Sequence, residues 1–222
     1  RAAVNAYVYA QRSTEVKDKN EAELLSRKAY EYLVMARRFL NPPPPVLIAC
    51  GGLSGSGKSR IGREIAPFIG SPPGAVILRD DVLRKNMMNV APHEPLGEEA
   101  YTPENERKVF ELLCRECRRV LATGQSVVAD ALFHDETQRR EIEELARDMG
   151  VKFQGFWVDA PLEIRAERVA SRKRNPSDVK TVGVLERQLD VDVGHVTWDR
   201  VDTSGDRLAT LAYVRSLLSE KI

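Results

Sequence analysis

The sequence has 222 residues, 42% of them hydrophobic, which is enough for one α/β domain with a full core and a small appendage. Its 34 basic and 33 acidic residues give a net charge of +1, which excludes a highly charged disordered chain and a global attraction to nucleic acid or to a membrane surface. No apolar run approaches the roughly 18 residues of a membrane span. With three cysteines and no signal peptide, we expect a cytoplasmic protein in a reducing compartment.

Residues 1–41 are predicted to form a helical arm. Apolar residues recur there at helical spacing, and Asn20 is predicted to cap the helix that contains most of them. Four prolines at positions 42–45 stop that helix, so we place a boundary there and a second domain at residues 46–222. Since the sequence begins with arginine rather than methionine, we expect it to be part of a longer protein. The arm would then be either the helical tail of a preceding partner domain or a clamp on the second domain.

After the prolines, apolar strands alternate with amphipathic helices. This alternation predicts a parallel sheet with helices on both faces, which is a three-layer α/β domain. Pro103 is predicted at the first position of one helix, and Asp135 is predicted to cap another. The predicted strands are 46–50, 75–78, 126–131, 153–158 and 197–201, and the predicted helices are 58–69, 102–123, 135–150, 161–174, 178–189 and 206–220.

A glycine-rich segment, GGLSGSGKS at residues 51–59, follows the first strand and fits the pattern G-x-x-x-x-G-K-[ST]. Glycines let main-chain N–H groups approach phosphate oxygens, Lys58 would neutralise the β- and γ-phosphates, and the Ser59 hydroxyl would bind Mg²⁺. The alternative is a flexible connection, but the position between a strand and a helix favours a nucleotide. The residues predicted to hold it are Gly52, Ser54, Gly55, Ser56, Gly57, Lys58 and Ser59.

The second predicted strand ends in RDDVLRK, residues 79–85. A carboxylate at the carboxyl end of this strand lies on the same rim as the glycine-rich loop, where it can accept the proton of an attacking hydroxyl. We expect Asp81 to be this base and Arg84, three residues later, to help hold the acceptor. The alternative is that Asp80 or Asp81 only caps the next helix.

The third predicted strand ends in a single acid, Asp130. Apolar residues followed by an acid suit a residue that holds Mg²⁺ directly or through water. Asp130 could instead orient the acceptor, or simply begin the turn after the strand.

The helix after the fourth strand carries arginines at three- and four-residue spacing, among them Arg168 and Arg172. In a phosphotransferase such residues close over the phosphates, so both are predicted to bind the nucleotide and to stabilise transition-state charge. The alternative is a solvated face.

The long irregular segment 85–101 is expected to form the acceptor site, because long loops in compact domains are commonly functional. His134 lies near the expected site without an assigned role.

These motifs together resemble the small P-loop kinase-like ATP-binding proteins, the group of polynucleotide kinase, gluconate and shikimate kinases, chloramphenicol phosphotransferase and zeta toxins. The likeness covers residues 46–215 and rests on GGLSGSGKS, RDDVLRK, AYTPE, VVADALF, FWVDAPLEIRAERVASR and WDRVDTSG. The sequence is more similar still to the C-terminal ATP-binding half of bacterial two-part proteins whose N-terminal half looks like an aminoglycoside phosphotransferase. The resemblance implies an adenylate-kinase-like P-loop NTPase fold, with five parallel strands in the order 2-3-1-4-5.

The resemblance also implies that the acid followed three residues later by arginine is the base, which matches Asp81 and Arg84. Asp80 stands where the group usually has serine, so both acids remain candidates. We expect an ATP- and Mg²⁺-dependent phosphotransferase that acts on a hydroxyl of a small molecule. The alternatives are a polynucleotide 5′-hydroxyl kinase, which would need a basic channel, and a regulatory ATP-binding module that acts through the arm.

Overall fold

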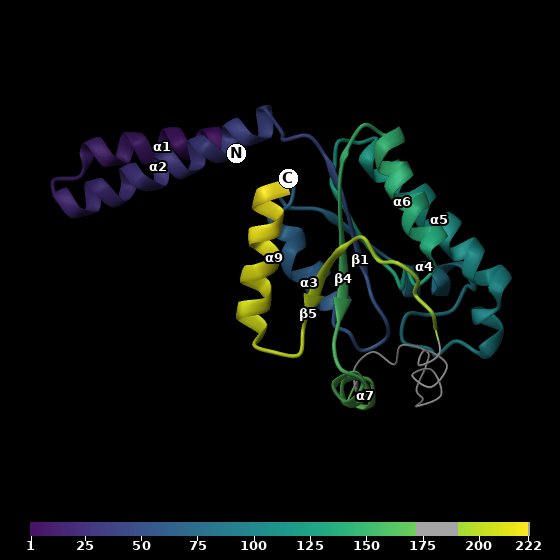
Figure 1. Ribbon diagram of the computed structural model, residues 1–222. Helices are drawn as coiled ribbons and strands as arrows, with labels where there is room; N and C mark the ends of the chain where they lie inside the picture. The colour runs from purple at the N-terminus through teal and green to yellow at the C-terminus, as the bar shows by residue number, and fades with distance from the viewer. Residues whose placement is uncertain (172–190, 222) are drawn as a thin grey trace. The chain divides into compact units, whose positions relative to one another are not determined.

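The computed structural model describes residues 1–171 and 191–221, and the chain divides into two compact units, Arg1–Pro43 and Pro44–Ile222 (Figure 1). The predicted helix at 178–189 and Arg172 lie outside the described residues. In the part of the chain that the structure describes, no helix combines the length and the apolar character needed to cross a bilayer.

The first unit is a hairpin of two helices, α1 (Ala2–Glu15) and α2 (Lys19–Leu40). Tyr9 and Tyr32 stack between them with ring centroids 5.5 Å apart. The predicted cap of α2 at Asn20 is wrong, because Asp18 is the N-cap and its carboxylate accepts hydrogen bonds from the N–H groups of Asn20 and Glu21. Asp18 has the extended backbone and the acceptor oxygen that this position requires.

The second unit is built on one five-stranded parallel sheet in the order β2-β3-β1-β4-β5, as predicted. Its register places Arg79 opposite Asp130, and Asp130 opposite Cys50, so the polar ends of β2 and β3 meet beside the end of β1. The strands are β1 (Val46–Gly51), β2 (Val76–Arg79), β3 (Val127–Asp130), β4 (Lys152–Asp159) and β5 (Asp199–Asp202).

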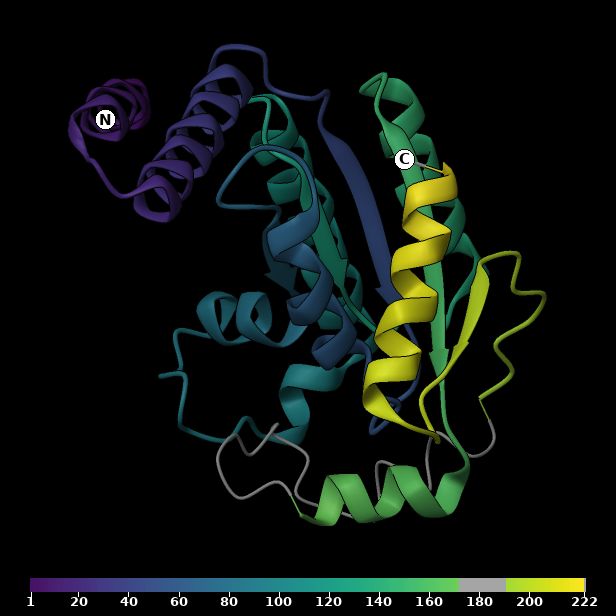
Figure 2. The ribbon, with the colours of Figure 1, turned by 90° about the vertical axis from the view of Figure 1, so that its left-hand side faces the viewer.

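Helices cover both faces of the sheet, which confirms the three-layer prediction (Figures 1 and 2). α3 and α9 lie on one face, and α5 and α6 lie on the other. The bounds are α3 (Lys58–Ile65), η1 (Ala66–Phe68), α4 (Asp80–Met87), η2 (Glu98–Tyr101), α5 (Pro103–Leu121), α6 (Glu136–Asp148), α7 (Leu162–Ala170) and α9 (Arg207–Lys221).

Local chemistry sets several helix ends. The Thr102 side chain accepts a hydrogen bond from the N–H of Asn105, with Pro103 at the first helical position, and Asp135 caps α6 through the N–H of Thr137. The helix predicted over 58–69 ends earlier, at Ile65, and continues as a 3₁₀ turn. Proline at the start of that turn lacks the N–H that would continue the α-helix.

The core consists of two apolar clusters, one on each face of the sheet. β1 is buried along its whole length and contributes to both, because successive side chains of a strand point to opposite faces. Leu47 and Ala49 join the α5–α6 side, whereas Ile48 and Cys50 join the α3–α9 side. This explains why the sequence of β1 is continuously apolar rather than alternating.

Trp198 lies directly over the backbone of β4 at Gly155. A Cβ atom on Gly155 would lie 2.4 Å from two ring atoms of Trp198, which is too close for any residue but glycine. The same indole packs edge-on against Phe133, with centroids 5.1 Å apart, and its Nε1 donates to Glu143 at 2.6 Å. The sheet therefore holds Trp198, and through it Phe133, in one place.

We predict that Gly155→Ala lowers the free energy of unfolding by about 1–3 kcal/mol, because the new methyl group must displace the indole. Urea unfolding followed by tryptophan fluorescence measures this. Gly205→Ala is the control, since nothing lies within 4 Å of a Cβ placed there, and it should change stability by less than about 0.5 kcal/mol. Equal stability of the two variants would contradict the packing described here.

Candidate nucleotide and acceptor site

The glycine-rich loop connects β1 to α3, and its backbone is held by close neighbours. The N–H of Gly52 donates to the carbonyl of Leu132 at 3.0 Å. Gly52 has φ +141°, and a Cβ atom there would lie 2.2 Å from the carbonyl oxygen of Val158. Gly55 has φ +83°, and a Cβ atom there would lie 2.5 Å from the carbonyl oxygen of Arg165. Both glycines are therefore required by conformation and by space.

Two arginines of α7 and one threonine after β5 fasten the loop through its own carbonyls. Arg165 Nε donates to Ser54 O at 3.0 Å, and Thr203 Oγ1 donates to Ser56 O at 2.5 Å. α3 begins at Lys58 directly after the left-handed Gly57, so the positive end of its dipole faces the loop. The shape of the loop is thus supported by contacts within the domain, and the N-terminus of α3 lies next to it.

Arg168, one of the two predicted lid residues, is part of this support. Its guanidinium donates to Thr203 O at 2.6 Å, to Thr203 Oγ1 at 2.9 Å and, at longer distance, to Gly55 O and Ser56 O. Burial, followed by the nearby Arg60, lowers the pKa of Arg168. In this structure Arg168 therefore holds the loop, and its closing over phosphates stays a prediction.

Three carboxylates gather at the carboxyl ends of β2 and β3. Asp81 pairs with Arg79 and accepts a hydrogen bond from the N–H of Val82 at 2.8 Å. Arg79 Nε also lies 3.7 Å from Asp130 Oδ2. The charge of Asp81, the predicted base, is therefore already compensated by a neighbouring arginine.

Asp80 has a different environment. Burial raises its pKa to about 6; Lys58 acts against this shift, while Asp130 and Asp81 add to it. Asp80 also lines a pocket beside the loop, which Asp81 does not. Of the two neighbouring acids, Asp80 is the one that lines this pocket.

Asp130 offers an oxygen that fits a metal ion. It is buried, and its Oδ1 has no hydrogen-bond partner. Burial raises its pKa, whereas Lys58 and a hydrogen bond with the Ser59 side chain lower it. Hydroxyl and carboxylate oxygens are the ligands that Mg²⁺ prefers, and it commonly needs only one or two carboxylates beside the substrate phosphates. The predicted pair Ser59 and Asp130 therefore fits Mg²⁺.

The pocket has an apolar floor and a polar edge. Its polar lining comes from the start of α4, from α5, and from the segment after β3 that continues into α6. The lining residues are Asp80, Arg84, Glu106, Val109, Phe110, Leu113, Ala131, Leu132, His134 and Gln138.

Arg84 lines this pocket but is not paired with Asp81. Its guanidinium donates to Ala100 O at 2.8 Å and to Glu106 Oε2 at 3.0 Å, and it lies over the Tyr101 ring at 4.8 Å. Arg84 and Asp81 thus have separate partners in this structure, and their joint binding of an acceptor stays a prediction.

The segment 85–101, predicted to form the acceptor site, does not line the pocket. The Lys85 ammonium donates to the carbonyls of Pro92 and Glu94, and Leu96 and Ala100 are buried. The segment folds back onto α4 and α5 through these contacts, and its role in binding an acceptor stays a prediction. The structure favours α5 and the segment after β3 as the pocket wall.

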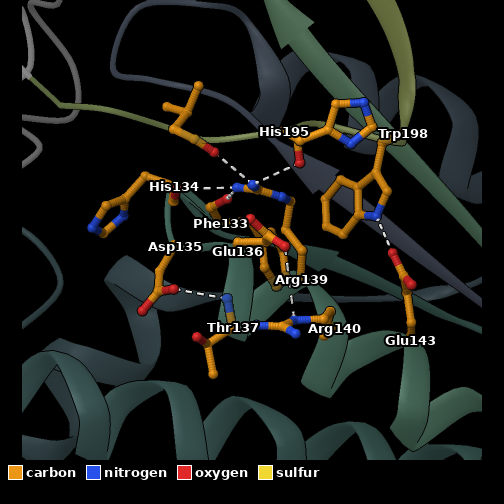
Figure 3. Close-up of polar contacts among 11 residues, drawn as sticks. Phe133, His134, Asp135, Glu136, Thr137, Arg139, Arg140, Glu143, His195 and Trp198 are labelled. Atoms are coloured by element: carbon orange, nitrogen blue, oxygen red, sulfur yellow. Dashed lines mark hydrogen bonds and ion pairs between the residues drawn. The ribbon is translucent and has the colours of Figure 1, made fainter.

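Arg139 is a structural residue of the site that the sequence analysis missed (Figure 3). Its buried guanidinium donates to Phe133 O at 2.7 Å and His134 O at 3.0 Å, and also to Val193 O at 2.6 Å and His195 O at 3.2 Å. One side chain therefore joins the pocket segment to the segment that precedes β5. The helical periodicity could have indicated its burial, because Arg139 lies three positions before the buried Ile142 and therefore on the same face of the helix.

The backbone between Asp130 and α6 is strained where Arg139 holds it. Phe133 has φ +48°, which is uncommon for a bulky residue and occurs mostly in special turns. The next residue, His134, lines the pocket, and its Nδ1 is buried without a hydrogen-bond partner. The turn therefore places His134 in the pocket lining, which the proximity of His134 to β3 only suggested.

The fold and the loop define a P-loop protein of the kinase-like type. The AAA domain family AAA_33 matches residues 47–191, so the chain belongs to this family. Uncharacterized protein Rv2004c of Mycobacterium tuberculosis (strain ATCC 25618 / H37Rv) is 30% identical over 213 residues, covering 93% of this chain and 40% of that protein.

Kinases are among the further relatives. Shikimate kinase of Brucella canis is 30% identical over 162 residues, covering 69% of this chain and 70% of the enzyme. The structure of the Mycobacterium tuberculosis APS kinase CysC in complex with AMPPNP and APS has a TM-score of 0.58 at 19% identity, with 80% of this chain and 99% of that chain covered. The fold is therefore one that holds a nucleotide in related kinases.

We predict that Arg139→Gln lowers the free energy of unfolding by about 3 kcal/mol, because buried carbonyls lose charge-assisted hydrogen bonds. Arg140→Gln is the matched control, since Arg140 is exposed and pairs only loosely with Glu136, at 4.0 Å. Chemical unfolding measures both variants, and hydrogen exchange at residues 133–134 and 193–195 locates the effect. If Arg140→Gln proves as destabilising as Arg139→Gln, Arg139 does not hold the two segments together.

Proposed function

We propose that this chain is an ATP- and Mg²⁺-dependent phosphotransferase that moves the γ-phosphate of ATP to a hydroxyl group of a small molecule. The observation that carries the proposal is the position of Asp80, which lies near enough to Lys58 of the phosphate loop for their charges to interact and which lines a small pocket. Membership of AAA_33 and the kinases among its relatives support the same reaction class.

The proposed roles follow from the geometry. The loop N–H groups and Lys58 would hold the phosphates, while Ser59 and Asp130 would hold Mg²⁺, which supplies charge neutralisation on the phosphate oxygens. The acceptor oxygen attacks the γ-phosphorus, the bond from that phosphorus to the β–γ bridging oxygen breaks, and ADP leaves. The hydroxyl proton passes to a carboxylate on the rim.

We propose Asp80 as the residue that takes this proton. A base with a pKa near the working pH is more effective than a strongly acidic one, and the pKa of Asp80 is raised to about 6. Asp81 has the spacing to Arg84 found in the resembling group, but it would have to leave Arg79 to reach an acceptor. Asp81 would instead keep Arg79 in place beside Asp130.

The pocket also bears on the alternatives. A regulatory module that only binds ATP needs no space beside the γ-phosphate, whereas the pocket gives an acceptor such a space. A polynucleotide kinase would need cations to bind a phosphate backbone, whereas the polar edge of the pocket carries Asp80 and Glu106. Both observations favour a small-molecule acceptor.

The chain spans 40% of the length of Rv2004c and of its two other mycobacterial relatives. We propose that the hairpin Arg1–Pro43 joins the kinase-like unit to an N-terminal partner domain in a longer protein of this kind. The activity of such a whole protein would then depend on both parts.

We predict that Lys58→Ala raises the Kd for MgATP about tenfold or more, because a charge-assisted contact to the phosphates is lost. Titration calorimetry measures this. Lys108→Ala is the control, since Lys108 is exposed and pairs with Glu104 on the surface of α5, and its Kd should equal that of the wild type. Unchanged affinity in Lys58→Ala would exclude the loop as the nucleotide site.

We predict that Asp80→Asn lowers phosphate transfer about 10²- to 10⁴-fold while MgATP still binds, because the proton acceptor is removed. Asp81→Asn should have a smaller effect. The acceptor for these assays comes from a screen with labelled ATP against sugars, nucleosides, antibiotics and 5′-hydroxyl oligonucleotides. The reverse order of effects would return the role of base to Asp81.

The same assignment predicts a pH dependence. Asp80 must lose its proton to act as a base, so wild-type kcat/KM should fall as pH drops below about 6, and this limb should vanish in Asp80→Asn. Folding raises the pKa of Asp80, so the folded protein keeps the Asp80 proton up to a higher pH than the unfolded chain does. Asp80→Asn should therefore be more stable than the wild type above about pH 6, and thermal unfolding tests this.

A further inference from the structure

The charge balance of the acceptor pocket is unusual for a site that would bind an anion. Among the described residues that line it, Arg84 is the one permanent cation, whereas Asp80 and Glu106 both bring carboxylates. Arg84 and Glu106 are paired at 3.0 Å within the pocket lining. Glu106 therefore neutralises the charge of Arg84, and the carboxylate of Asp80 gives the lining residues a net negative charge.

Arg84 is also poorly placed to change partners. Its side chain is only 4% exposed, it donates to the Ala100 carbonyl, and it lies over the Tyr101 ring. The Glu106 side chain is 30% exposed and lies 3.0 Å from this buried guanidinium, so an anion that binds Arg84 must compete with Glu106. A carboxylate or sulfate on an acceptor would have to displace Glu106 and would also meet Asp80, and each like-charge contact disfavours binding.

The rest of the lining suits a different ligand. Val109, Phe110 and Leu113 contribute apolar side chains to the lining, while His134 and Gln138 contribute groups that can hydrogen-bond. Such a surface fits the C–H face and the hydroxyl groups of an uncharged alcohol, and its net negative charge also accepts an amino group.

We infer that the acceptor is an uncharged or cationic alcohol with an apolar face, and that Glu106 determines this specificity by occupying Arg84. The inference rests on the proposed function and adds the substrate class. It also separates this chain from shikimate kinase and from the APS complex of CysC, because shikimate and APS are anions at neutral pH.

The test compares matched acceptors that differ in charge, namely shikimate with its methyl ester, and gluconate with glucose and glucosamine. Each is added at millimolar concentration to protein saturated with MgAMPPNP, at about pH 8, and binding is followed by saturation-transfer NMR. Phosphate transfer from labelled ATP to the same compounds is measured in parallel. The variants are Glu106→Gln, which keeps the shape but removes the charge, and Glu104→Gln, an exposed neighbour on α5, as the control.

In the wild type and in Glu104→Gln, we expect the uncharged or cationic member of at least one pair to bind about tenfold or more tightly than its anionic partner. In Glu106→Gln the preference should shift toward the anion by about tenfold. The double variant Arg84→Gln/Glu106→Gln should lose this shift, which assigns it to the uncovered guanidinium.

Three results would overturn the inference: equal or better binding of the anion by the wild type, no shift in Glu106→Gln with MgAMPPNP still bound, or no binding of either member of any pair to any variant. A protein that fails to bind MgAMPPNP would instead contradict the proposed function. Thermal unfolding with and without MgAMPPNP shows that each variant is folded. If Glu106→Gln is not folded, Glu106→Asp, which shortens the side chain by one methylene but keeps its charge, must leave the preference as in the wild type.

Discussion

The site depends on how closely backbone segments approach the loop between β1 and α3. Val158 of β4 and Arg165 of α7 lie so near Gly52 and Gly55 that a side chain at either position would overlap with a carbonyl oxygen. The curled shape of the loop is therefore set by packing against the rest of the domain. Organisation of this kind lowers the conformational entropy that the loop must otherwise lose when a nucleotide binds.

The fold could be predicted because its signals are local. Strand and helix periodicity, the helix cap at Asp135 and the proline after Thr102 each act over a few residues, and the resemblance supplied the strand order that periodicity does not contain. The cap of α2 was assigned wrongly because Asp18 and Asn20 both have side chains that suit that position, and only the backbone conformation distinguishes them.

The candidate site could be predicted only in part, because its residues act through partners that lie far away in the sequence. The position of the phosphate loop followed from its motif, whereas Arg84 contacts Ala100 and Glu106, and Arg139 contacts segments more than fifty residues apart. Residue type and spacing place such arginines on a rim or a helix. They do not tell which carboxylate or carbonyl is near enough to bind them, and that decides whether an arginine is free for a ligand.

The sharing of β1 between the two apolar clusters has a consequence for how the domain comes apart. Leu47 and Ile48 are neighbours in sequence but belong to opposite layers, so neither layer can open without exposing part of the same central strand. The sheet and both helical layers should then melt as one cooperative unit. The carboxyl end of β1 continues directly into the phosphate loop, so this unit also carries the loop, and partial opening at the nucleotide site would require loss of the core.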